Sequence, residues 1–194
     1  DTLIFAGWNT MTKDLYEKLK AYVAGGGRLL ISAAHLNTSA KRGAAPEFVD
    51  GGELADFLGC NIVGEYKMNG GVKFCRNGTK ESVRYPASKD LMCDAYFPSG
   101  FANWAKVEMK GGKVMCFFSD TCNAPEPGSE VSPVLVENNY GKGSVSFMTN
   151  IDYPGAAGVY KLYSVIVKER LTDSHRNCDL KVVASDKVRY AFYF

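Results

Sequence analysis

The sequence has few of the features that mark membrane proteins or nucleic-acid-binding proteins. It contains no apolar run near the roughly 20 residues that a membrane-spanning helix needs. No block of Lys or Arg exceeds two residues, and the formal net charge is only +2, so no nucleic-acid-binding surface is expected. The first residues include neither a Met nor the basic segment of a signal peptide.

Histidine and cysteine are too scarce and too scattered for a metal site. The two histidines are His35 and His175, and none of the six cysteines forms a Cys-x-x-Cys pair. Tetrahedral zinc sites usually use closely spaced ligand pairs, so neither a metal nor another cofactor is predicted. Six cysteines in 194 residues are also too few for a disulfide scaffold. We expect most of them to be reduced and half-buried.

What the sequence does contain is typical of a packed domain. Apolar residues make up 46% of the chain and charged residues 23%, which predicts a hydrophobic core. A chain of 194 residues suffices for one good-sized domain, or for one domain with a small appendage. The apolar run from Leu3 to Gly7 reads as a strand, so the chain begins almost inside one. We therefore expect the sequence to be a piece of a longer polypeptide, truncated at its N-terminus.

The first 34 residues predict a strand, a helix and a second strand. Thr12 can cap a helix whose inward face carries Leu15, Leu19, Tyr22 and Val23, and the Gly25–Gly27 run ends this helix. A second apolar strand follows from Arg28 to Ala34. Two strands joined by one helix predict a parallel pair with a right-handed crossover, and hence an α/β fold.

The rest of the chain alternates between loops and short strands. A long loop is expected from Leu36 to Gly52, followed by a short helix from Glu53 to Leu58 and a mostly β region up to Asn150. The predicted strands are Asn61–Tyr66, Val72–Phe74, Ser82–Tyr85, Ala105–Met109, Val114–Ser119, Val134–Asn138 and Ser144–Met148. Hairpin connections are predicted at Met109–Lys113 and Asn139–Gly143. A last helix is predicted at Val159–Leu171, then a linker at Thr172–Asp179, then a hairpin around Ser185–Lys187.

Two stretches together resemble the class I glutamine-amidotransferase-like fold. They are the start of the chain through Ser32, with its glycine turn, and the stretch Tyr140–Phe147 with the helix after it. The resemblance is closest to the trimerisation domain of beta-galactosidases that carry a catalytic barrel upstream. It implies an open, mostly parallel sheet with flanking helices, of the amidotransferase or flavodoxin type, with a β-rich insertion. The implied domain is 1–172, and 173–194 is a linker and β-hairpin tail, or the opening of a further β domain.

The catalytic residues of true amidotransferases have no counterpart here. In those enzymes the strand after the glycine turn ends in an elbow that carries a Cys nucleophile, whereas this sequence reads Ile31-Ser32-Ala33-Ala34-His35. Their late strand is followed by a His, whereas this one continues Thr149-Asn150-Ile151-Asp152. A thiol needs a nearby base to react at neutral pH, so amidotransferase activity is not expected.

Polar and aromatic residues at the carboxyl ends of strands are the candidate ligand-binding residues, because open parallel sheets bind ligands there. Rings, amides and carboxylates of this kind suit a sugar. Capping and turn formation also explain the same residues, and this is the favoured interpretation. Cys122 is a further candidate nucleophile, which has only two histidines available to activate it. The strand-end candidates are Trp8, Asn9, His35, Asp120, Asn150, Asp152 and Tyr153.

The sequence is therefore consistent with three functions. The first is a non-catalytic accessory or assembly domain of a larger carbohydrate-active protein, such as a beta-galactosidase-like glycoside hydrolase. Its partners would be the rest of the parent chain and further copies of itself, and the resemblance implies that the catalytic acid and nucleophile lie in an upstream barrel. The second is a degenerate amidotransferase-like module that binds a small ligand such as a sugar. The third is an independent hydrolase that uses Cys122 or His35.

Overall fold

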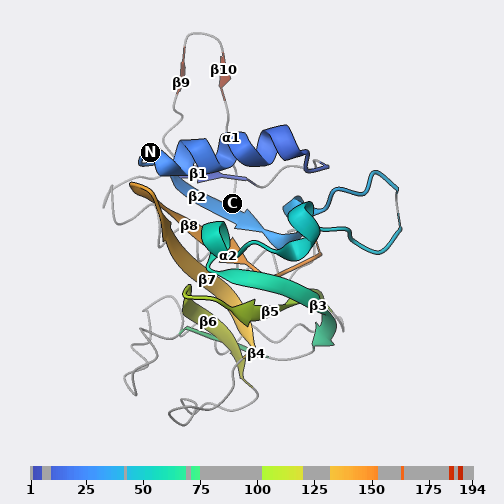
Figure 1. The fold of residues 1–194 in the computed structure, drawn as a ribbon. Coiled ribbons are helices and arrows are strands. Elements are labelled where there is room, and N and C mark those ends of the chain that lie inside the picture. Colours follow the sequence, from blue (N-terminus) through green and yellow to red (C-terminus); the bar gives the residue numbers. More distant parts are fainter. Residues whose placement is uncertain are drawn as a thin grey trace.

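The structure, a computed structural model, describes residues 2–5, 10–41, 43–68, 71–74, 102–119, 132–152, 163, 184–185 and 188–189 (Figure 1). The predicted strand Ser82–Tyr85, the linker Thr172–Asp179 and, apart from Tyr163, the predicted helix Val159–Leu171 lie outside these residues. The elements are, in order, β1 (Thr2–Ile4), α1 (Lys13–Ala24), β2 (Arg28–Ser32), the 3-10 helices η1 (Ala33–Leu36) and η2 (Val49–Gly52), α2 (Ala55–Leu58), β3 (Cys60–Met68), β4 (Gly71–Phe74), β5 (Ala102–Met109), β6 (Lys113–Ser119), β7 (Pro133–Tyr140), β8 (Gly143–Met148), β9 (Ala184–Ser185) and β10 (Val188–Arg189).

The predicted strand–helix–strand unit is confirmed. β1 and β2 pair in parallel with Thr2 opposite Arg28, and β2 pairs in parallel with β8 with Arg28 opposite Ser144. All four β2 residues after Arg28 are buried, as expected for a strand covered on both faces. The carboxyl ends of β2 and β8 therefore lie next to each other.

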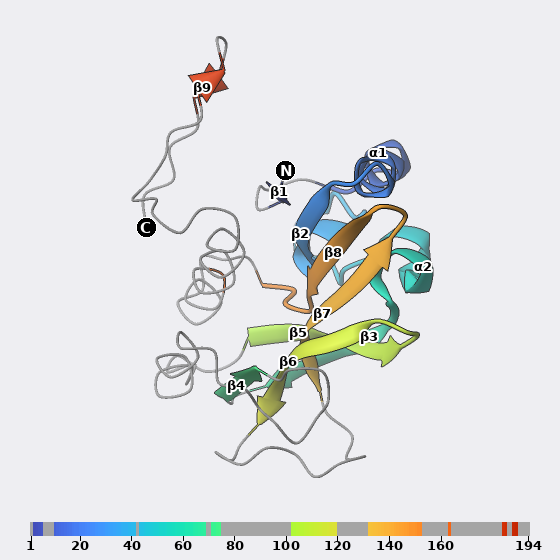
Figure 2. The ribbon, with the colours of Figure 1, turned by 90° about the vertical axis from the view of Figure 1, so that its left-hand side faces the viewer.

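The helix between β1 and β2 follows the predicted pattern closely. The Thr12 hydroxyl accepts a hydrogen bond of 3.2 Å from the Leu15 N–H, which caps the helix. Its buried residues are Tyr16, Leu19 and Val23, so the inward face is centred on Tyr16 rather than Leu15. In Figure 2, α1 and α2 cover the same face of the β2–β8–β7 part of the sheet.

The large sheet has the strand order β1-β2-β8-β7-β6-β4. Its first three strands are parallel, whereas β7, β6 and β4 are added antiparallel. The predicted hairpin at Asn139–Gly143 is confirmed: Gly141 and Lys142 connect Tyr140 to Gly143, and Gly141 has a φ of 59° that glycine adopts readily. The α/β class is confirmed, and the predicted parallel arrangement holds for the first three strands and not for the other three.

The predicted hairpin at Met109–Lys113 is wrong. β5 pairs with β3 in a two-stranded sheet, and β6 belongs to the large sheet. The turn between β5 and β6 bonds to the residue before β3 instead. The Gly59 carbonyl accepts hydrogen bonds from the N–H groups of Lys110 (2.8 Å) and Gly112 (2.9 Å). The predicted hairpin in the C-terminal tail is confirmed, with Val188 opposite Ser185.

Candidate functional site

Three of the seven predicted strand-end residues can be placed. His35, Asn150 and Asp152 are described by the structure, whereas Trp8, Asn9, Asp120 and Tyr153 lie outside the described residues, as does Cys122. His35 follows the end of β2, and Asn150 follows the end of β8. Because these strands are parallel neighbours, His35 and Asn150 lie at adjacent strand ends.

A buried serine–histidine pair lies at the end of β2. The Ser32 hydroxyl and the His35 Nδ1 atom are 2.8 Å apart, and both residues have 0% exposed surface. The His35 ring meets the Phe5 ring edge to face at 5.5 Å. Ser32 is the last residue of β2 and His35 lies in the following 3-10 helix, so the local backbone brings the two side chains together.

Asn150 and Tyr163 complete this strand-end cluster, which consists of Ser32, His35, Asn150 and Tyr163. The Ala34 N–H donates a 3.0 Å hydrogen bond to the Asn150 carbonyl, which ties the end of β2 to the end of β8. Asn150 is fully buried and Tyr163 nearly so. Burial raises the pKa of Tyr163 to about 12, and the neighbouring Ser32 and Asn150 side chains act in the opposite direction. Tyr163 is therefore a neutral phenol at physiological pH.

Asp152, a predicted ligand-binding residue, bonds to β5 in the structure. Its Oδ2 atom accepts a 2.6 Å hydrogen bond from the Asn103 N–H, and its Oδ1 atom accepts one of 3.0 Å from Asn103 Nδ2. The Asn150 side chain in turn donates to the Asp152 carbonyl at 2.8 Å. Asp152 thus fastens β5 to the segment that follows β8.

The chemistry of the strand-end cluster is limited by its burial. A serine hydroxyl within hydrogen-bond distance of an imidazole is the arrangement of a nucleophile and its base. A substrate must be able to reach the nucleophile, however. Ser32, His35 and Asn150 have no exposed surface, so solvent and substrate do not reach the serine hydroxyl in this structure. The side-chain hydrogen bonds described above for these residues are local, and the backbone hydrogen bond from Ala34 to the Asn150 carbonyl joins the ends of β2 and β8. In the part of the chain that the structure describes, no group of three His, Cys, Asp or Glu residues is placed to hold a metal ion.

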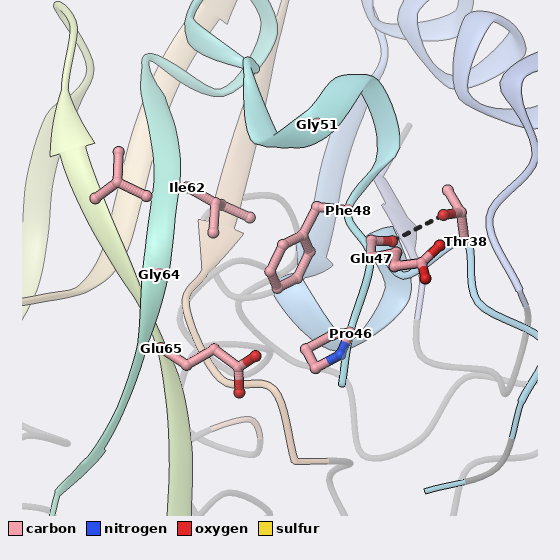
Figure 3. A pocket seen from close by; sticks show the side chains of 9 residues that line it. Thr38, Pro46, Glu47, Phe48, Gly51, Ile62, Gly64 and Glu65 are labelled. Carbon is pink, nitrogen blue, oxygen red and sulfur yellow. Dashed lines mark hydrogen bonds between the residues drawn. The ribbon is translucent and has the colours of Figure 1, made fainter. Parts of the chain in front are cut away.

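An open groove lies elsewhere, between the loop after β2 and the strand β3 (Figure 3). Its volume is about 770 Å³. In Figure 3, the Phe48 ring points into the groove, toward β3. The lining residues are Thr38, Pro46, Glu47, Phe48, Gly51, Ile62, Val63, Gly64 and Glu65.

Hydrogen bonds within the chain hold the loop wall of this groove in place. Asn37 Oδ1 accepts hydrogen bonds of 3.0 Å from the N–H groups of Ser39 and Glu47. The Glu47 carbonyl accepts from the Thr38 N–H at 2.6 Å and from the Thr38 hydroxyl at 2.9 Å. Asn37 also forms an isolated antiparallel bridge with Phe48. The conformation of the loop wall is therefore fixed by hydrogen bonds within the chain itself.

Sequence reasoning did not find this groove. The segment Leu36–Gly52 was predicted as a long loop, and no residue in it was among the candidates. One local signal was present, since Asn37 begins a turn of the kind that asparagine side chains stabilise and Phe48 is an aromatic residue in a polar segment. The approach of Phe48 to β3 depends on the tertiary fold.

Neither a protein-family description nor a curated protein sequence matches the chain. Solved structures do match it in fold. The beta-galactosidase from the Antarctic haloarchaeon Halorubrum lacusprofundi is 15% identical, with a TM-score of 0.53 over 91% of this chain and 22% of that one. Gan42B, a GH42 beta-galactosidase from G. stearothermophilus, is 14% identical, with a TM-score of 0.51 over 93% of this chain and 23% of that one.

This likeness concerns the fold alone. The chain is similar in fold to a part of these beta-galactosidases, and it spans less than a quarter of their length.

Proposed function

We propose that the chain is a non-catalytic accessory and assembly domain of a larger carbohydrate-active protein, a beta-galactosidase-like glycoside hydrolase. Its partners in this proposal are the rest of the parent chain and further copies of the same domain. The proposal includes the amidotransferase-like fold and a domain spanning 1–172 that is followed by a hairpin tail.

The burial of the strand-end cluster is the observation that carries this proposal. In an α/β enzyme with a parallel sheet, the carboxyl ends of the strands carry the open site. Here Ser32 and His35 occupy that position with no exposed surface and bond to each other. The polar residues at the strand ends are engaged within the fold, which favours an assembly role over a catalytic role for the domain.

The two stretches that resemble the trimerisation domain also support the proposal, because they contact each other in the structure. The Lys142 N–H donates to the Ala24 carbonyl at 3.0 Å, and the Ser144 N–H donates to the Gly27 carbonyl at 3.2 Å. The glycine turn after α1 and the hairpin before β8 are thus parts of one packed unit. The fold similarity to parts of two beta-galactosidases points in the same direction.

The alternative of a small ligand bound at the strand ends has less support. A sugar needs hydroxyl-binding groups that it can reach. His35 and Asn150 are fully buried, and Asp152 already bonds twice to Asn103.

Light scattering of the purified chain over a range of concentrations tests the assembly role. We expect concentration-dependent association through β1, which is the first strand in the sheet order and leaves Leu3 38% exposed. Leu3→Lys should weaken this association. Val63→Lys, at the groove on β3, is the matched control and should leave it unchanged. A chain that stays monomeric at high concentration contradicts the assembly role.

Turnover assays test the absence of catalysis. Nitrophenyl glycosides and glutamine are expected to give no hydrolysis above the rate without protein. Robust turnover that disappears in Ser32→Ala would instead make the strand-end cluster an active site.

A further inference from the structure

The outer edge of β3 carries backbone groups that point away from its partner strand. On β5, the Ala105 N–H donates to the Thr149 carbonyl at 2.7 Å, and the Asn103 carbonyl accepts from the Ile151 N–H at 2.8 Å. Asn103 and Ala105 therefore direct their backbone groups away from β3. In an antiparallel pair, the residues opposite them must also direct theirs outward, because bonded and non-bonded pairs alternate.

The residues opposite Asn103 and Ala105 are Lys67 and Glu65. Each of them consequently presents one N–H and one carbonyl on the edge of β3 that faces away from β5. Among the described residues, no backbone hydrogen bond reaches these outward groups of Glu65 or Lys67. The edge is ready to pair with another extended segment.

The groove lies along this edge and supplies the space for such a segment. Glu65 lines both the edge and the groove, and Pro46 and Phe48 form an apolar wall across from it (Figure 3). The exposed Val63 lies between Ile62 and Gly64, where the register of the β3–β5 pairing shifts. Pro46 and Phe48 would give the added strand apolar contacts on the side of the loop wall.

The acidic side chains of the groove favour a segment with positive charge. Glu47 and Glu65 are exposed, and neither forms an ion pair in the part of the chain that the structure describes. Phe48 lies beside them, and an aromatic face adds attraction for a cationic side chain. Glu65 on the strand edge, with the Phe48 ring and Glu47 on the loop wall, complements a peptide that carries lysine or arginine.

We propose that this groove binds an extended, basic peptide segment of another polypeptide, which adds as a strand to the outer edge of β3. The segment's backbone bonds to the outward groups of Glu65 and Lys67, and its lysine or arginine side chains reach Glu47 and Glu65. This inference is independent of the proposed assembly role, which uses β1.

Fluorescently labelled peptides test the charge selection. A blocked heptapeptide of alternating threonine and arginine is compared with one that has glutamate in place of arginine. Attraction to one peptide and repulsion of the other are expected to give at least about a tenfold preference for the basic one at low salt. The double variant Glu47→Gln with Glu65→Gln should remove most of this preference, and added salt should reduce it.

Two substitutions at Lys67 test the strand addition. Lys67→Pro removes the outward N–H while leaving the bonds to β5 intact, because an edge position without a ladder bond tolerates proline. Lys67→Ala removes the same charge and keeps the N–H. The alanine variant should bind the basic peptide as tightly as the natural protein or more tightly, whereas the proline variant should bind about fivefold more weakly than the alanine variant. Circular dichroism and thermal melting check that both variants fold.

Four other outcomes of these experiments would each overturn the proposal. Equal binding of the two peptides would show that charge does not select the ligand. Equal binding by the proline and alanine variants would show that the β3 edge is not used. An oligomer disrupted by Lys67→Pro, without peptide binding, would make the groove an interface between copies. A sugar that binds in the groove equally well to both Lys67 variants, while neither peptide binds, would make it a carbohydrate site.

Discussion

Gly143 lies against the carbonyl oxygens of Gly27 and Val23, so a side chain at this position would overlap main-chain atoms. We therefore expect Gly143→Ala to lower the free energy of unfolding by about 2–3 kcal/mol, because neither carbonyl belongs to a flexible side chain that can move away. Urea denaturation measures the difference. Gly64→Ala is the control, since the nearest atom to its new Cβ is the Lys106 Cβ at 4.0 Å, and it should change stability by less than about 0.5 kcal/mol.

Asp152 is expected to stabilise the join between β5 and the end of β8. Asp152→Ala removes two hydrogen bonds to Asn103 and should lower the free energy of unfolding by about 2 kcal/mol, as is usual for bonds to a charged group. Glu108→Ala is the matched control, because this carboxylate bonds to Lys110 on the surface and is 56% exposed. Its loss should cost less than about 0.5 kcal/mol. Equal losses in the two variants would contradict the role given to Asp152.

The hydrogen bond between Ser32 and His35 is expected to stabilise the folded chain. Ser32→Ala leaves a buried imidazole nitrogen without its 2.8 Å partner and should lower the free energy of unfolding by about 1–3 kcal/mol. Ser39→Ala, which loses only a 3.4 Å hydrogen bond from the Lys41 N–H, should have almost no effect. A Ser32→Ala variant as stable as the natural chain would show that the pair does not stabilise the turn from β2 into η1.

Stability is expected to fall as the pH rises from about 9 toward 12. Burial raises the pKa of the Cys60 thiol from its usual 9.0 to about 12, and those of the Tyr66 and Tyr163 hydroxyls from 10.0 to about 12. Within this window the unfolded chain has released protons that the folded chain still binds. The unfolded state is therefore favoured more strongly with each increase in pH.

Urea denaturation at neutral pH and at intervals between pH 9 and 12 measures this effect. Cys60→Ala should flatten the first part of the pH dependence, because Cys60 has the lowest pKa of the three groups in the unfolded chain. A free energy of unfolding that does not change over this range would contradict the burial of these groups.

Local patterns were sufficient to predict β1, α1 and β2. The apolar run after Arg28 and the helical spacing of Leu19 and Val23 depend only on neighbouring residues, and Thr12 and the glycine turn mark the two ends of the helix. The meeting of His35 and Asn150 was also predictable, because parallel strands bring their carboxyl ends to one edge of a sheet.

Contacts between distant segments explain what could not be predicted. The Met109–Lys113 turn looks like a hairpin, but its N–H groups bond to the Gly59 carbonyl, which lies about fifty residues earlier. The groove likewise requires Phe48 to face β3. The burial of Ser32 and His35 could not be predicted either. A polar pair at a strand end has the same sequence whether its side chains are exposed to solvent or buried.

The pairing of Arg28 in β2 with Ser144 in β8 has a consequence for the chain during its synthesis. About 116 residues separate these partners, which at about 5–20 residues per second take roughly 6–23 seconds to translate. Until then the buried positions of β2 lack the neighbour that covers one of its edges. The sheet can close only late, so β2 in a nascent chain arrested before Gly143 should be cut by proteases that leave the finished domain intact.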